Sequence, residues 1–429
     1  MKIALKTAPQ QAVCGIALDI GTTTLAGSLV DMGAGRRLAV VSMPNPQSRW
    51  GADVLSRINA IAEKPALLEK MQRCVIKASG GMISELLNSS GVKKNALREI
   101  SAAGNSVMEH IFLGVSPEPI GAPPYRPVFK EARRMSAAAA GFDLPPAVML
   151  YTFPLIGGFV GGDSVAVMLS TAITKAKDIG ASLIIDIGTN SEIIACTPKG
   201  IFTTSAAAGP AFEGGNISGG MTAGKGAVRG VVIGDHGIKL DVVGGGSPAG
   251  ICGSGVIDAL AGLLDKGVIE PSGRIRNPDE VPSALADRIK PSTGGNAFVL
   301  SRSASHRIAV TQKDVRMLQV AKAAIRAGIT VLLKKAGVGP EDVTRVFIAG
   351  AFGGNLKKEA LARIGVLDMI WLDRVLSVGD AVLEGAELTL ASGDCKDEAE
   401  ALAQRAGYVP LSGSRLFEKE FVNNMNFTG

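Results

Sequence analysis

The sequence of 429 residues has few aromatic side chains, few cysteines and no long apolar runs. Aromatic residues make up 4% of the chain, and no basic block carries interleaved aromatics, so the usual pattern of a nucleic-acid-binding surface is missing. No stretch of about 18 uncharged apolar residues predicts a membrane span. The N-terminus also lacks a long apolar signal segment. We therefore expect a cytoplasmic protein that binds neither nucleic acid nor membrane.

The cysteines are few and scattered. They stand at positions 14, 74, 196, 252 and 395, and no two form a C-x-x-C motif. This spacing matches no zinc or iron–sulfur ligand set and argues against a disulfide framework. Glycine, in contrast, is abundant, with 54 residues against an average near ~7% of a chain. The glycines form short clusters, which indicates many tight backbone turns.

The length of the chain and an internal repeat indicate two related halves. A chain of 429 residues exceeds one ordinary core, and strand and helix patterns alternate twice along it. The tetrapeptide D-I-G-T occurs at Asp19 and again at Asp186. We predict a tail at 1–11, an α/β half at 12–177, and a second α/β half at 180–429. A β-rich subdomain is expected within the second half at about 210–310.

Each D-I-G-T motif follows an apolar segment that is typical of a buried strand. An acid at a strand end can hold Mg²⁺ through water, and the glycine lets a ligand approach the backbone. The following hydroxyls and N–H groups can donate to phosphate oxygens. One copy would be ordinary turn chemistry, but two copies and a third glycine loop, "FIAGAFGG", favour a polyphosphate site. The candidate metal-binding and catalytic residues are Asp19 and Asp186, and the candidate phosphate contacts are Gly21, Thr22, Thr23, Gly188, Thr189 and Asn190.

This pattern resembles the superfamily of actin, heat-shock chaperones and sugar kinases. The resemblance implies a two-lobed actin-like (ribonuclease H-like) α/β ATPase fold, in which duplicated halves surround a nucleotide cleft. It also implies ATP and Mg²⁺ as ligands. "FIAGAFGG" is similar to the adenosine motif of that superfamily, where Gly350, Gly353 and Gly354 would lie against adenine and ribose.

Within the superfamily, the chain most resembles the ATPase part of the reductive activators of corrinoid proteins. The similar segments are "NPQSRWGADVLSRI", "AAGNSVMEHIFLG", "GPAFEGGNISGGM", "GICGSGVIDALAGLL" and "TQKDVRMLQVAKAAIRAGI". This resemblance implies ATP-dependent reduction of cob(II)alamin to cob(I)alamin in a corrinoid-binding partner, for use in methyl transfer. It also implies an iron–sulfur cluster, for which this chain has no cysteine ligands. We therefore expect the electron donor to be a removed domain or a separate protein.

Three further residues carry open alternatives. Asp163 stands at a predicted helix start, where similar sugar kinases have a general base; its carboxylate could instead cap the helix. Gln319 and Lys322 lie three apart on a predicted helix, so they could face the adenosine or belong to a solvated helix face. Asp380 stands where the family pattern has Asn. A small-molecule kinase with Asp163 as base and a chaperone-like ATPase remain alternative functions, and a homodimer remains open.

Three other features have simpler structural interpretations. "GGMTAGKG", Gly219 to Gly226, resembles a P-loop but lacks the Ser or Thr that binds Mg²⁺. Cys252 is predicted to be a small buried residue before a helix rather than a nucleophile. His110 lies in an apolar helical segment and is predicted to be a packed residue rather than a ligand.

Overall fold

The computed structural model describes residues 13–174, 180–234, 237–302, 307–350 and 356–427. By their internal contacts, two units form: Met1–Asp178 with Asp380–Tyr408, and Ile179–Gly379 with Val409–Gly429. The division near residue 178 lies beside the boundary predicted from the sequence. The segment Asp380–Tyr408 was placed in the second half by that prediction, but it packs within the first unit.

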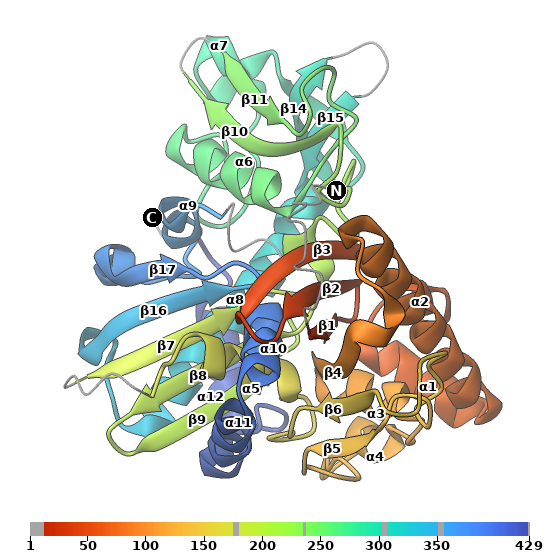
Figure 1. The fold of residues 1–429 in the computed structure, drawn as a ribbon. Helices are drawn as coiled ribbons and strands as arrows, with labels where there is room; N and C mark the ends of the chain where they lie inside the picture. The colour runs from red at the N-terminus through yellow and green to blue at the C-terminus, as the bar shows by residue number, and fades with distance from the viewer. Residues whose placement is uncertain (1–12, 175–179, 235–236, 303–306, 351–355, 428–429) are drawn as a thin grey trace. The chain divides into compact units, whose positions relative to one another are not determined.

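The first unit is built on a mixed sheet with the strand order β3-β2-β1-β4-β6-β5 (Figure 1). Its central strand β1 pairs antiparallel with β2 and parallel with β4. All of β1 except Asp19 is buried, because helices cover both faces of the sheet. The strands are β1 (Cys14–Ile20), β2 (Thr24–Asp31), β3 (Arg36–Pro44), β4 (Leu97–Gly104), β5 (Arg133–Ser136) and β6 (Met149–Thr152).

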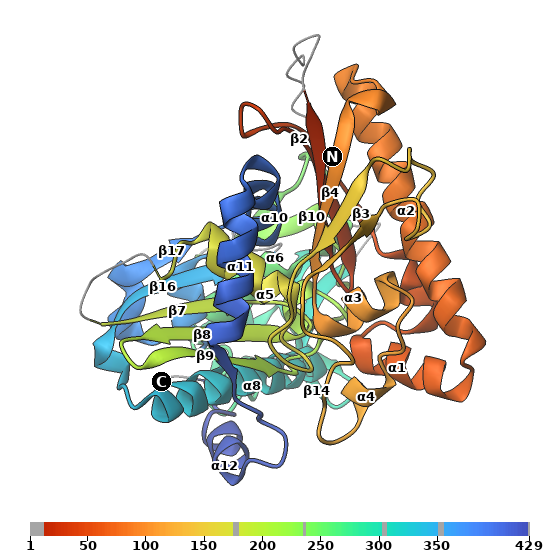
Figure 2. The ribbon, with the colours of Figure 1, turned by 60° about the horizontal axis from the view of Figure 1, so that its bottom comes forward.

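Helices of the first unit come from both of its chain segments. The long helix α2 packs on β2 and β3, while α10 packs on β1 and β4 and against α5 (Figure 2). The apolar stripe predicted for residues 68–82 lies in α2, where Met71, Val75 and Met82 are buried. The helices are α1 (Val54–Glu63), α2 (Ala66–Ser90), α3 (Ser106–Phe112), α4 (Glu118–Gly121), α5 (Gly162–Ser170), α10 (Ala381–Ala391) and α11 (Gly393–Arg405), followed by the short strand β18 (Ala406–Tyr408).

The sheet of the second unit repeats the pattern of the first. Its strands follow the order β17-β16-β7-β8-β9, with β7–β8 and β8–β9 antiparallel and β7 parallel to β16. Strand β7 thus corresponds to β1, and each is followed by a D-I-G-T turn. This correspondence confirms the duplication predicted from the repeated motif. The strands are β7 (Ala181–Asp186), β8 (Ser191–Thr197), β9 (Gly200–Ala206), β16 (Val343–Ala349) and β17 (Val375–Ser377).

A β-rich insertion separates β9 from β16. It contains two three-stranded sheets, β11-β10-β12 and β13-β14-β15, and helix α6 packs on β10 (Figure 1). These strands fall within or next to the range for which a β-rich subdomain was predicted. The elements are β10 (Ala227–Ile233), β11 (Ile238–Val242), β12 (Gly250–Ile251), α6 (Gly253–Asp265), α7 (Ser283–Ala286), β13 (Ile289–Ser292), β14 (Gly295–Arg302) and β15 (Arg307–Thr311).

Helix α8 (Gln312–Ala336) lies across β8 and β9 and carries α12 (Arg415–Asn423) on its other side. The predicted capping pair is present: the Thr311 hydroxyl accepts from the Asp314 N–H at 3.2 Å, and the Asp314 carboxylate accepts from the Thr311 N–H at 2.8 Å. The remaining helix of the unit, α9 (Lys358–Arg363), packs on α6. Among the residues that the structure describes, no helix combines the length and apolar character needed to cross a bilayer.

The structural interpretations of His110 and Cys252 are confirmed. His110 is buried, stacks on Phe129 with ring centroids 4.4 Å apart, and accepts at Nε2 from the Val128 N–H. Burial lowers the pKa of its imidazole to about 4. Cys252 is buried immediately before α6. The P-loop-like segment leads into strand β10 rather than into a helix, as expected for a chance match.

Candidate functional site

The first D-I-G-T turn joins β1 to β2. Asp19 is partly exposed between two buried neighbours on β1, so its carboxylate lies at the one polar position of that strand. Gly21 and Thr22 are partly exposed, and Thr23 is exposed. A Cβ added at Gly21 would lie 2.4 Å from the Thr24 carbonyl oxygen, so the tightness of this turn requires glycine.

Side chains from three other segments hold this turn. The Asn45 side chain donates to the Gly21 carbonyl at 2.8 Å, and the Arg57 guanidinium donates to the Thr22 carbonyl at 2.6 Å. The Thr22 hydroxyl accepts from the Asn105 side chain at 2.9 Å. The turn is therefore fixed by the first unit before any ligand binds, which lowers the cost of ordering it around a ligand.

Asp163 lies next to a second acid, Glu109. Helix α5 begins at Gly162, so Asp163 is in the first turn rather than at the cap position, and its carboxylate accepts from the Ser164 N–H at 2.6 Å. Glu109, on α3, is buried and accepts from the Gly104 N–H at 3.1 Å. Its Oε2 has no hydrogen-bond partner among the described residues. Two carboxyls thus share a water-poor site.

Burial raises the pKa of both acids, and the charge of Asp163 adds to the effect on Glu109. Burial is the main cause for Asp163, whose pKa rises to about 6 although backbone donors oppose the change. For Glu109, burial and the charge of Asp163 together raise the pKa well above its usual range. Burial thus favours the neutral form of Glu109, whereas a pKa of about 6 leaves Asp163 mostly ionised at neutral pH. An ionised carboxylate with a pKa near 6 is suited to accept a proton.

The second D-I-G-T turn joins β7 to β8. Asp186 is partly exposed at the end of β7, and Gly188, Thr189 and Asn190 are partly exposed in the turn. The Thr189 hydroxyl donates to the Glu213 carboxylate at 2.6 Å. Glu213 thereby orients the side chain of a candidate phosphate contact and adds a second carboxylate at this turn.

The third glycine loop begins beside Asp186. Gly350 follows β16, which pairs with β7 so that Ala349 lies opposite Asp186. The φ angle of Gly350 is +103°, and a Cβ at this position would lie 2.7 Å from the Asp186 Oδ1. The structure therefore brings Gly350 and Asp186 together, and only glycine fits there. Gly353 and Gly354 lie outside the described residues.

The predicted adenosine contacts on α8 are buried. Gln319 and Lys322 are 1% and 2% exposed, so the alternative of a solvated helix face does not hold. Gln319 donates to the Met425 carbonyl at 2.8 Å, and the Lys322 ammonium donates to the carbonyls of Asn424 at 2.6 Å and Asn426 at 2.5 Å. Burial lowers the pKa of Lys322 to about 8. Both side chains hold the C-terminal segment, and their contact with adenosine stays a prediction.

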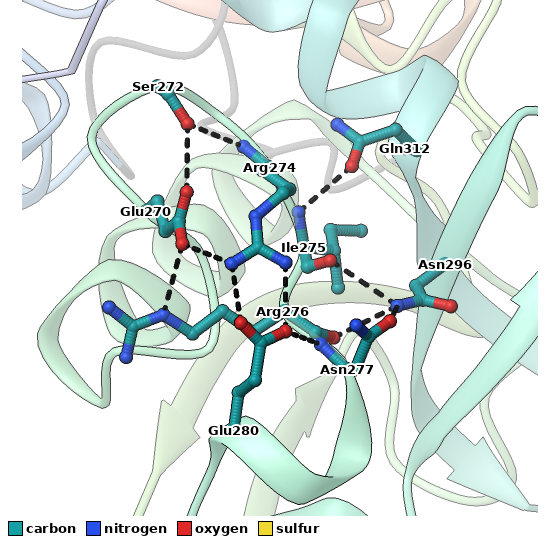
Figure 3. Close-up of polar contacts among 9 residues, drawn as sticks. All are labelled: Glu270, Ser272, Arg274, Ile275, Arg276, Asn277, Glu280, Asn296 and Gln312. Carbon is teal, nitrogen blue, oxygen red and sulfur yellow. Dashed lines mark hydrogen bonds and ion pairs between the residues drawn. The ribbon is translucent and has the colours of Figure 1, made fainter.

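A polar loop after α6 fixes the start of α8 (Figure 3). Arg274 binds the carboxylates of Glu270 and Glu280, and its hydrogen bonds lower the pKa of Glu280 to about 2. Gln312, the first residue of α8, accepts from the Ile275 N–H at 2.9 Å and donates to the Gly273 carbonyl at 2.7 Å. These contacts hold α8, and with it the two buried polar residues, in a defined register.

Several site residues were missed by the sequence analysis. Asn45, Arg57, Asn105, Glu109 and Glu213 contact predicted site residues or share their environment. All five lie in segments that carry the family resemblance, so the segments were found without the roles of their residues. Asp380 is exposed and precedes α10, within the first unit.

The donor set of the two turns fits Mg²⁺. Carboxylates and hydroxyls are hard oxygen ligands that suit Mg²⁺, and backbone N–H groups and threonine hydroxyls can donate to phosphate oxygens. The described residues contain no group of three His, Cys, Asp or Glu side chains placed to bind a metal. A magnesium ion at these turns would complete its coordination with water and phosphate oxygens, as this ion usually does. Asp19 and Asp186 lie in different units, so their binding of one common ligand stays a prediction.

Comparison with known families covers nearly the whole described chain. Residues 14–176 match the model of the RACo middle region, and residues 180–429 match the model described as the C-terminal domain of RACo, the ASKHA domain. The chain belongs to the RACo family of reductive activators of corrinoid proteins. The ASKHA match also confirms the predicted actin-like ATPase fold.

Individual RACo relatives agree with this assignment. The chain is 31% identical over 424 residues to the corrinoid activation enzyme RamQ of Eubacterium limosum, covering 97% of this chain and 71% of that protein. It is 25% identical to a reductase of the methylated amine-specific corrinoid protein of Methanosarcina barkeri, covering 96% of this chain and 77% of the other. A solved structure of a reductive activator for a corrinoid iron–sulfur protein superimposes with a TM-score of 0.89 at 35% identity, covering 98% of this chain and 67% of that one.

Proposed function

We propose that this RACo-family protein binds and hydrolyses Mg-ATP and uses it to drive the reduction of a corrinoid protein from cob(II)alamin to cob(I)alamin in the cytoplasm. Asp19 and Asp186 would hold Mg²⁺, and the residues of the two turns would bind the phosphates. The bound ion would offset the charge of the phosphoryl oxygens. The observation that carries the proposal is the duplicated hairpin pair with its matching acid, glycine and threonine turn, found within a chain of this family.

Asp163 is the proposed acceptor of a proton from the attacking water. Its partial burial, its position in the first turn of α5 and its pKa near 6 support this role. The same features would suit the base of a small-molecule kinase, which transfers the phosphoryl group to a hydroxyl instead of water. The two functions differ in their product, since only the ATPase releases inorganic phosphate without a second substrate.

The partner is proposed to be a corrinoid-binding protein, because the named relatives activate or reduce such proteins. Reduction of cobalt consumes one electron per corrinoid, which ATP does not supply. We propose that an iron–sulfur donor outside this chain provides it. ATP binding or hydrolysis would then couple to the step through a difference in affinity between conformations.

The test combines ligand binding with turnover. Mg-ATP at about 100 times its dissociation constant should add about 2.7 kcal/mol of stability and raise the melting temperature by roughly 5 °C. Phosphate release should increase when a cob(II)alamin-loaded corrinoid methyl-carrier is added, and absorbance should show cobalt reduction only when an iron–sulfur donor is also present.

Controls separate this function from the alternatives. ATP without Mg²⁺ should give a smaller thermal shift, and the apo form of the corrinoid protein should not increase phosphate release. Transfer of phosphate to a small hydroxyl compound, with no response to any corrinoid protein, would contradict the activator function and favour the kinase.

A further inference from the structure

A buried arginine lies directly behind the first D-I-G-T turn. Arg57, on α1, is 0% exposed, and every partner of its guanidinium among the described residues is uncharged. It donates to the Thr22 carbonyl at 2.6 Å, to the Gly51 carbonyl at 3.0 Å and to the Gln47 Oε1 at 3.1 Å, and it contacts the Met108 sulfur at 2.9 Å. A buried guanidinium normally has a carboxylate partner, so this arrangement calls for an explanation.

The carboxylate of Asp53 has an electrostatic effect on Arg57. It is hydrogen-bonded to the N–H and hydroxyl of Ser56 at 2.8 and 2.7 Å, where it caps α1. Burial lowers the pKa of Arg57 to about 10, and Asp53 opposes this change. The guanidinium is therefore charged at neutral pH, and its charge is only partly offset by the protein.

The contacts of Arg57 belong to one network that faces the turn. Gln47 Oε1 accepts from Arg57 and, at 3.4 Å, from the Asn45 side chain. Asn45 donates to the Gly21 carbonyl through its side chain and to the Thr23 carbonyl through its backbone N–H, each at 2.8 Å. The three consecutive carbonyls of the turn are thus held by a single connected set of donors.

This set of donors determines the direction of the peptide groups. In a trans peptide, the carbonyl and the N–H point to opposite sides. The carbonyls of residues 21–23 accept from this network, so in each of these peptides the N–H of the next residue lies on the side opposite to the bonded carbonyl. Backbone N–H groups of a turn can bind an anion. A buried positive charge behind the turn favours an anion as well.

We propose that Arg57 is a positioning residue that fixes the first turn in its anion-binding conformation and favours the phosphates of ATP through its charge, which the protein offsets only in part. This inference rests on the proposed function, since it takes the turn to be a phosphate site. The inference adds Arg57, a residue on α1 that need not touch the ligand, to the residues on which phosphate binding depends.

The test compares Arg57→Lys and Arg57→Met with wild type by titration calorimetry. Both variants should bind Mg-ATP about tenfold more weakly or worse, because a charged hydrogen bond to the turn is lost or misplaced. Binding of AMP, which lacks the β- and γ-phosphates, should change less than twofold. A merely structural role would weaken both ligands together. The matched control is Arg49→Lys, an exposed arginine of the same segment that lies over Trp50, which should behave as wild type.

An unchanged ratio of Mg-ATP to AMP affinity in a folded Arg57→Lys protein would overturn the inference. If both Arg57 variants fail to fold, Gln47→Glu decides: it places a carboxylate beside Arg57 and should weaken Mg-ATP selectively, whereas unaltered binding overturns the proposal. If wild type binds no nucleotide, the proposed function fails separately. Amide hydrogen exchange then tests Arg57, since Arg57→Lys should speed exchange in residues 21–24 relative to β4, and equal exchange overturns its positioning role.

Discussion

Replacing Asp186 by Asn should reduce ATP hydrolysis by about 100-fold, because the variant loses the negative charge that we propose to hold Mg²⁺ against the phosphates. The substitution keeps the size of the side chain. Asp186 is only partly buried, so the apo protein should keep its melting temperature within a few degrees. Gly350 should remain accommodated beside the side chain, since the amide occupies the same space as the carboxylate. Phosphate release and thermal unfolding measure the two quantities separately.

The matched control for this substitution is Asp143→Asn. Asp143 is fully exposed and forms a surface ion pair with Lys94 at 3.1 Å, an interaction of small energetic value. The Asp143→Asn variant should therefore hydrolyse ATP at the wild-type rate. Asp19→Asn should show a loss similar to that of Asp186→Asn if both acids serve one metal–phosphate complex. Full hydrolysis in Asp186→Asn at saturating Mg²⁺ would contradict the assignment of the second turn.

Much of the fold was predictable because the sequence states it twice. The apolar segments ending at Asp19 and Asp186 predicted buried strands. In its own sheet, each of these strands lies between an antiparallel strand that follows it directly in the chain and a parallel strand from later in the chain. The capping pair at Thr311 and Asp314 marked the start of α8 for a local reason, since each side chain bonds to the backbone N–H of the other residue. Local patterns of this kind can be read directly from a sequence.

The return of residues 380–408 to the first unit was not predictable in this way. Helix α10 packs on β4, which ends 277 residues before it in the chain, and on β1, which ends 361 residues before it. One link is the hydrogen bond between the buried hydroxyls of Ser101 and Thr389 at 2.7 Å. Nothing in the local sequence of α10 distinguishes the sheet of the first unit from the sheet of the second unit, because an apolar helix face can pack on any apolar sheet.

The supporting residues of the site were missed for a related reason. Arg57 lies in an amphipathic helical segment, where an arginine is usually solvated. Its burial depends on Gln47 and Gly51, which belong to one short segment, and on Thr22 in the first D-I-G-T turn. Likewise, the acid pair of Glu109 and Asp163 is made by two helices whose starts are far apart in the chain. Residue type and spacing do not report such convergence.

The acid pair leads to the second large effect: Asp163→Asn should lose activity and gain stability. Removing a general base typically costs about 10²-fold or more in rate, so phosphate release should fall to a similar extent. In wild type, activity should decline as the pH falls below about 6, because protonation of Asp163 removes the proposed base. The remaining activity of the variant should lack this acidic decline.

The effect on stability follows from the direction of the pKa shift. The folded protein raises the pKa of Asp163 from 3.8 to about 6, so between these values it binds more protons than the unfolded chain. The free energy of unfolding therefore falls as the pH rises from about 4 to about 6, and this loss of stability remains at its full size above that range. Asp163→Asn removes an ionisation cost of about 2 kcal/mol at pH 7.5, allowing for partial exposure, and the gain should vanish below pH 4.

Glu109→Gln provides the matched comparison for Asp163→Asn. Burial and the charge of Asp163 raise the pKa of Glu109 and so favour its neutral form, whose charge and shape the amide preserves. The variant should keep the acidic decline near pH 6 and most of the activity. A decline that moves to lower pH would mean that Glu109 is ionised in the wild type and repels Asp163. Hydrolysis at the wild-type rate by Asp163→Asn would exclude Asp163 as the base. If Asp163→Asn gains no more in melting temperature over the wild type at pH 7.5 than at pH 5, the Asp163 carboxylate is solvated, since burial is the cause assigned to its raised pKa.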